Sequence, residues 1–180
     1  MKTNKRIDTL IAGLRSKDGM QRERARHALV AIGKPAAPFL IGLLTDLSDR
    51  VRWEACKALV SIKAPAAAIP LVAALSDKSS EVRWLAAKAL IAIKRRAVVP
   101  LLQTLEDHFD LPEVRRGAHH VLNALAKQKL LNQDTLAVLD KLSYLEPYSS
   151  VAWAARKARN LTRKPGSSSQ QAQQMALKVS

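Results

Sequence analysis

The chain has 180 residues, which is enough for a single domain, and carries a formal net charge of +15 at pH 7. Nearly half of the residues are apolar but only 4% are aromatic, and alanine and leucine dominate the apolar set, which favours helices over sheets. No apolar run reaches the roughly 18 residues of a membrane span, and a single cysteine, Cys56, excludes an internal disulfide framework.

The N-terminal segment is basic but lacks the long apolar centre and the small-residue cleavage site of a secretion signal. We therefore expect a cytoplasmic protein with no membrane span. The excess of positive charge is concentrated in residues 1–35 and 127–180. It favours an acidic partner, such as nucleic acid, anionic lipid or an acidic protein surface, although the same charge could serve solubility alone.

One apolar pattern recurs about every 31 residues along the chain. Residues 51–62 read VRWEACKALVSI, and residues 82–93 read VRWLAAKALIAI. Related segments occupy residues 21–32 and 114–125, and a divergent copy begins at Val151. The apolar positions follow the period of an amphipathic helix, so each copy predicts one helix of a repeated unit.

A second apolar segment lies between successive copies and carries a proline near its start. These segments are residues 37–44, 68–75 and 98–105, with Pro38, Pro70 and Pro100. Proline is tolerated in the first turn of a helix, where the missing N–H has no partner in any case. Serines precede three of the Val-initiated helices and are suitable N-caps: Ser48, Ser79 and Ser149.

The repeated unit is therefore a helical hairpin, and an isolated hairpin leaves one apolar face that only a neighbouring hairpin can bury. We predict an all-α, right-handed α-α superhelix of about five hairpins over residues 1–162, with an irregular fourth repeat and a polar capping last helix. Residues 163–180 follow a Pro-Gly break and are rich in serine and glutamine, so we expect a flexible tail.

The pattern V-R-x-x-A-A-x-A-L-x-x-I, followed by a proline, L-x-x-x-L and an aspartate before the next V-R, resembles the HEAT-like repeats of the phycobilisome-lyase type. The resemblance covers roughly residues 5–162. It departs from that family after Ala-Leu, where the family's glycine is replaced by Val60, Ile91 and Asn123. The resemblance implies a helical-repeat fold, and it implies that the V-R helices line the concave face.

The resemblance also gives the repeated aspartates and arginines a structural role. In HEAT-like repeats such residues form a ladder that links successive units. The matching pairs here are Asp46 with Arg52, Asp77 with Arg83, and Asp107 with Arg115. We expect them to stabilise stacking rather than to bind phosphate.

All three tryptophans fall in one slot of the repeat. On a helical wheel with Val51 at zero, the buried face holds Ala55, Ala58, Leu59 and Ile62, and Trp53 lies about 200° away. A lysine follows each tryptophan by four residues. The predicted partner-binding row is Trp53, Lys57, Trp84, Lys88, Arg116, His120, Trp153 and Lys157.

Two interpretations of this row remain open. The tryptophans could pack between repeats, as most buried aromatic rings do. Alternatively, an exposed ridge of aromatic rings and cations would be a binding surface, because tryptophan and arginine are enriched in binding hot spots. Trp84 is central in the row and should matter more than Trp153.

Catalytic and metal-binding motifs are missing from the sequence: it contains no H-E-x-x-H, C-x-x-C, Gly-rich phosphate loop or G-x-S-x-G. His119 and His120 point about 100° apart on a helix and do not converge on a metal. Cys56 occupies a small-residue slot and is expected to be inert packing. We therefore expect no enzyme, no cofactor, no metal and no small-molecule substrate.

The sequence favours a scaffold that binds a protein partner with an acidic and apolar surface. A basic nucleic-acid binder, resembling the HEAT-like DNA glycosylases that cradle a duplex, is the alternative; near the row it would have only Glu54 and Glu81 as acids. A bilin-lyase subunit is a third possibility that follows from the family name alone. Steep loss of DNA affinity with salt would identify a nucleic-acid binder.

Overall fold

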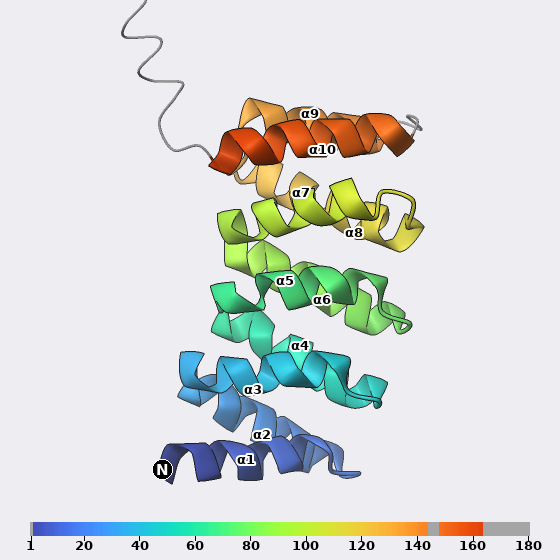
Figure 1. The fold of residues 1–180 in the computed structure, drawn as a ribbon. Helices are drawn as coiled ribbons and strands as arrows, with labels where there is room; N and C mark the ends of the chain where they lie inside the picture. The colour runs from blue at the N-terminus through green and yellow to red at the C-terminus, as the bar shows by residue number, and fades with distance from the viewer. Residues whose placement is uncertain (1, 144–147, 164–180) are drawn as a thin grey trace, which may run out of the picture.

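The computed structural model describes residues 2–143 and 148–163, and within these ranges all regular secondary structure is helical (Figure 1). The helices stack as five pairs in two layers. One layer holds α1 (Lys2–Leu14), α3 (Ala37–Gly42), α5 (Ala68–Ala73), α7 (Val98–Asp107) and α10 (Tyr148–Arg163). The other layer holds α2 (Gly19–Ile32), α4 (Asp49–Ile62), α6 (Ser80–Ile93), α8 (Pro112–Lys127) and α9 (Gln133–Ser143).

Each proline-containing segment between two V-R helices forms a short α-helix with a 3-10 turn at one or both ends. A short 3-10 turn precedes α3, α5 and α7, and a second one follows α3 and α5; the turns are Lys34–Ala36, Leu43–Thr45, Pro65–Ala67, Ala74–Ser76 and Lys94–Ala97. Pro38, Pro70 and Pro100 lie in the first turns of these helices, as predicted. The all-α solenoid of helical hairpins expected from the sequence is confirmed.

The repeated leucines form the core between the two layers. Leu29, Leu59, Leu90 and Leu122, at the same position of the four repeats, are all completely buried. Each contributes apolar area that only the neighbouring helices remove from water, so the hairpins stabilise one another rather than folding alone.

The predicted N-caps differ in detail from the structure. Ser79 caps α6, because its hydroxyl accepts a hydrogen bond from the Val82 N–H at 3.4 Å. Ser48 occupies the N-cap position of α4, but its side chain makes no capping bond. The prediction for Ser149 is wrong, because α10 begins at Tyr148 and includes it.

The aspartate–arginine ladder links the first repeats. Arg52 donates to both carboxylate oxygens of Asp77, with Nε–Oδ2 and Nη2–Oδ1 distances of 2.7 and 2.9 Å. One repeat earlier, Asp46 pairs with Arg15, which follows α1 and does not belong to a V-R helix, at an Nη2–Oδ2 distance of 2.5 Å. The side-chain link from a V-R arginine to the aspartate of the next unit is therefore the one between Arg52 and Asp77. The Asp107 carboxylate accepts a hydrogen bond from Gln103 of its own helix.

The last helical pair breaks the stacking order of the repeats. In the regular part, each V-R helix packs on the V-R helix before it, as α6 does on α4 and α8 on α6. At the end, α9 packs on α8, whereas α10 packs mainly on α7 and α9. Figure 1 shows α10 on the viewer's side of the stack, with α9 behind it. The V-R-like helix at Val151 has therefore changed layer.

Ion pairs hold α10 on α7. Glu106 of α7 accepts from Arg156 at 2.7 Å and from Arg159 at 2.7 Å, one arginine on each carboxylate oxygen. The segment between Lys127 and α10, which departs from the repeat pattern in sequence, contains the regular helix α9. Arg163 is the last residue of α10, and the remainder of the predicted tail, residues 164–180, lies outside the described residues.

Among the described residues no single helix is long and apolar enough to cross a membrane. One pair of helical runs, Gly19–Ile32 with Lys34–Thr45, meets that length and composition only when the two are combined, and it is bent by 117°.

Candidate protein-binding face

Six of the eight predicted residues lie along three neighbouring helices of one layer. We call them the tryptophan ridge: Trp53 and Lys57 on α4, Trp84 and Lys88 on α6, and Arg116 and His120 on α8. The three helices pack side by side in that order. Trp84, at the centre, has 56% of its surface exposed. An indole ring that projects this far from the core is available to a partner.

Each tryptophan of the ridge carries a lysine stacked on its ring. The Nζ atoms of Lys57 and Lys88 lie 4.3 Å from the ring centroids of Trp53 and Trp84. The spacing of four residues puts the two side chains on the same face of the helix. The attraction between the cation and the ring restricts both side chains, so a partner would meet a preorganised pair.

Trp53 is less exposed than Trp84 and also packs against the core. The guanidinium of Arg26, from α2, lies 5.9 Å from its ring centroid. Trp53 therefore takes part in packing between repeats. Trp84 does not, because most of its surface is exposed. On α2, one repeat earlier, Glu23 and His27 stand at the positions of Trp53 and Lys57. Both side chains are exposed, and they lie 3.8 Å apart.

Trp153 and Lys157 do not continue the ridge. They sit on α10, which packs on α7 in the other layer. Trp153 is 63% exposed, and Lys157 Nζ lies 5.7 Å from its ring centroid. The two side chains share one helix face, as the four-residue spacing predicts, but α10 belongs to the other layer from the helix that carries Trp84.

A buried ion pair lies beneath the ridge, and sequence reasoning missed it. Glu54 is 4% exposed and accepts from Arg26 Nη1 at 2.6 Å, with Arg22 Nε at 3.4 Å. Both arginines belong to α2, so the pair links α2 to α4. Because Glu54 is buried and paired with these arginines, it is not available as a free acid on the tryptophan ridge. Its arginine partners lie one repeat away, on another helix. The spacing of charged residues within one helix therefore could not predict this ion pair.

Two hollows flank Trp84 along the ridge. One, of about 360 Å³, is lined by Trp53, Ser80, Glu81 and Trp84. The other, of about 240 Å³, lies between α6 and α8 and is lined by residues that include Leu75, Ala87, Arg116 and His120. The ring of Trp84 therefore separates two recesses, one per repeat interval. This geometry suits an elongated partner that places successive side chains in them.

The other reactive side chains have structural surroundings. Cys56 is completely buried, and burial raises the pKa of its thiol to about 12, so it stays protonated and unreactive at neutral pH. His119 Nε2 lies 3.1 Å from Ser143 Oγ, which ties α8 to α9. The described part of the chain holds no group of three or more His, Cys, Asp or Glu side chains that could bind a metal ion.

The family model for HEAT repeats matches residues 7–90 and 70–159. The chain belongs to the HEAT repeat family. Comparison with curated proteins gave no match.

Among solved structures, this HEAT protein is similar to a chain of the complex of CpcE and CpcF of phycocyanin lyase from Nostoc sp. PCC7120. The two are 25% identical with a TM-score of 0.56, and the match covers 85% of this chain and 97% of that chain. The resemblance to lyase-type HEAT-like repeats seen in the sequence is thereby confirmed.

Two engineered or designed proteins are also among the similar structures. An engineered protein is 23% identical with a TM-score of 0.48, covering 86% of this chain and 79% of that chain. A designed armadillo repeat protein in complex with the peptide (KR)4 is 19% identical with a TM-score of 0.41, covering 85% and 99%.

The lyase comparison corrects one expectation. The absence of catalytic motifs predicted a protein that is not an enzyme, and this prediction is wrong because the similar chain is a component of phycocyanin lyase. Motif patterns recognise sites that one chain carries by itself. They give no signal for a chain that, like the similar one, occurs in an enzyme complex.

Proposed function

We propose that this HEAT protein is a subunit of an enzyme assembly and that it recognises a protein partner through the tryptophan ridge. The observation that carries the proposal is Trp84, an indole that is 56% exposed at the centre of a row of three helices. An exposed ring of this size costs solubility unless a partner covers it.

The likeness to a lyase chain supports the assembly. That chain occurs in a complex of two proteins, and its match to this one covers nearly its whole length. Lys57 and Lys88 add positive charge beside the rings, and within the described structure they contact tryptophan and no carboxylate. The partner surface that fits the ridge is therefore apolar with acidic residues around it.

The test is affinity purification from source cells with matched variants. Tagged wild-type protein is compared with Trp84→Ala and with Ile69→Ala, which removes a similarly exposed apolar side chain (73%) from α5 in the other layer. A protein bound through the ridge should be retained by wild type and Ile69→Ala and lost from Trp84→Ala. With the purified partner, Trp84→Ala should weaken binding by about 2 kcal/mol or more, as hot-spot truncations do.

Two outcomes would overturn the proposal. Equal retention by Trp84→Ala and wild type would mean that the partner binds elsewhere. Loss of the retained material after nuclease treatment, with affinity for duplex DNA that falls steeply with salt, would indicate a nucleic-acid binder instead. Circular dichroism of Trp84→Ala checks that the fold survives the substitution.

A further inference from the structure

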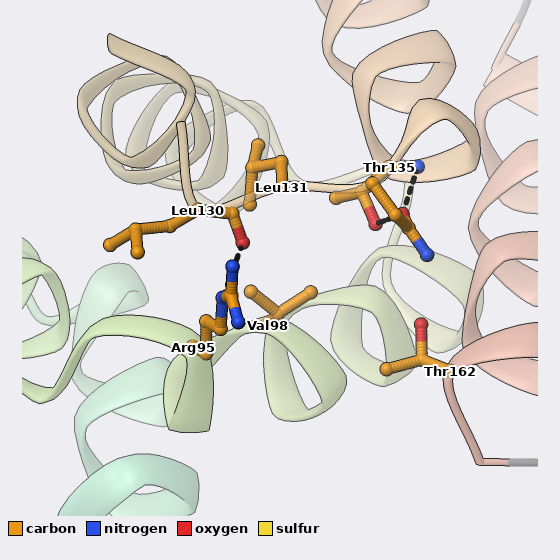
Figure 2. Close-up of a pocket in the computed structure, with 7 residues that line it drawn as sticks. Arg95, Val98, Leu130, Leu131, Thr135 and Thr162 are labelled. Atoms are coloured by element: carbon orange, nitrogen blue, oxygen red, sulfur yellow. Dashed lines mark hydrogen bonds between the residues drawn. The ribbon is translucent and has the colours of Figure 1, made fainter. Parts of the chain in front are cut away.

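A separate hollow of about 300 Å³ lies where the regular repeats meet the last helical pair (Figure 2). Arg95 lines it from the 3-10 turn before α7 and Val98 from the first position of α7. Leu130 and Leu131 line it from the connection between α8 and α9, and Thr162 from the end of α10. Three stretches distant in sequence meet here because α10 packs on α7. The hollow is thus a product of the layer change.

Hydrogen bonds orient the polar side chains of this hollow. Arg95 Nε donates to the Leu130 carbonyl oxygen at 3.1 Å, which fixes the guanidinium and leaves its two terminal amino groups without an acceptor among the described residues. Asn132 Oδ1 accepts from the backbone N–H and the hydroxyl of Thr135, at 2.9 and 2.6 Å. With that oxygen engaged, the amide nitrogen of Asn132 is the group left to donate.

The charge around the hollow is mainly positive. No acidic residue lines it; the basic residues Lys94, Arg96 and Lys129 are exposed next to it in sequence, against one acidic neighbour, Asp134. Arg95 also replaces a small residue, since Ala64 stands at its position one repeat earlier. A wall of donors in a positive field attracts an anion, and a planar guanidinium pairs best with a carboxylate or a phosphate.

The rest of the wall is apolar. Val98 is buried, and Leu130 and Leu131 are partly buried with faces toward the hollow. Inorganic phosphate would leave these side chains uncovered, whereas a short hydrocarbon chain would cover them.

We propose that this hollow binds a small amphipathic carboxylate. The carboxylate pairs with the terminal amino groups of Arg95, and the apolar body lies over Val98 and Leu131. This site is independent of the tryptophan ridge, and its occupant is a small molecule rather than a protein.

The test uses hexanoate as the probe and follows the backbone amide signals of the full chain by NMR. Hexanoate should bind saturably in roughly the millimolar range expected for so few atoms. The shifts should concentrate at residues 95–98 and 130–135. Arg95→Gln should weaken binding about tenfold, the effect of losing one charged hydrogen-bonding group.

Matched probes and a matched variant make the result decisive. Arg96→Gln removes the same charge from the next residue, which does not line the hollow, and should weaken hexanoate binding much less than Arg95→Gln does. Hexylamine and inorganic phosphate should bind at least about tenfold more weakly than hexanoate. Equal weakening by Arg96→Gln, equal binding of hexylamine or of phosphate, or no saturable binding of hexanoate would each overturn the proposal.

Discussion

At the scale of single residues, the helix ends show where the chain accepts backbone strain. The helix α2 ends at Gly33 with φ 76° and ψ −137°, and α6 ends at Lys94 with nearly the same angles, φ 61° and ψ −135°. Glycine adopts this conformation freely, whereas a side chain makes it costly. Lys94 thus holds a strained conformation next to Arg95.

We therefore predict that Lys94→Gly stabilises the protein by about 1 kcal/mol, because the strain released exceeds the extra entropy of an unfolded glycine. Urea melts measure it. Gly33→Ala, the reverse change at the matching position, should lower the free energy of unfolding. A loss of stability in Lys94→Gly would show that the lysine side chain stabilises the fold by more than its strained backbone conformation destabilises it.

At the scale of helices, the Arg52–Asp77 pair joins consecutive repeats and makes their stacking sensitive to acid. Burial alone would raise the pKa of Asp77, but the hydrogen bonds from Arg52 and from the Ser79 N–H outweigh burial and hold that pKa below its usual value. A carboxyl whose pKa is lowered by folding stabilises the protein above its unfolded pKa of about 4. That contribution is lost as the pH falls through the lower pKa of the folded state.

Asp77→Asn should accordingly lower the free energy of unfolding at pH 7 by about 1–3 kcal/mol. The difference from wild type should shrink as the pH falls below about 4, because the wild-type carboxyl then becomes neutral too. Chemical denaturation at a series of pH values measures both curves. A difference that stays constant down to about pH 2 would show that the charge of Asp77 has no part in the stacking.

The core leucines give a second prediction at this scale. Leu59→Ala and Leu90→Ala should each destabilise the protein by roughly 2–5 kcal/mol, because both side chains are completely buried between α4, α6 and their neighbours. Thermal or urea melts provide the measurement. Losses under about 0.5 kcal/mol at both sites would mean that the helices are not packed as described.

At the scale of the whole molecule, the last helix closes the stack and the segment beyond it is predicted to be dispensable. Removal of residues 144–180 deletes α10, takes both arginines from Glu106 and exposes the core beneath α7, so the melting temperature should fall by more than about 5 °C. Removal of residues 164–180 alone should leave it nearly unchanged. A clear drop in the second variant would show that the segment docks on the solenoid.

The sequence by itself determined the repeat, the phase of each helix and the placing of each Trp and its Lys on one helix face. These features depend on contacts within one helix or between adjacent copies of one pattern, such as the four-residue spacing of Trp84 and Lys88. The cytoplasmic location and the identity of the partner stay predictions, as does the binding role of the ridge.

Only the tertiary structure decided where α10 packs. In sequence, Val151 begins another copy of the repeat, and nothing local distinguishes packing on α8 from packing on α7. The choice depends on long-range contacts, chiefly Glu106 with Arg156 and Arg159, across 50 residues or more. The same contacts separate Trp153 from the ridge and create the hollow at Arg95. Helical periodicity carries no information about contacts at that range.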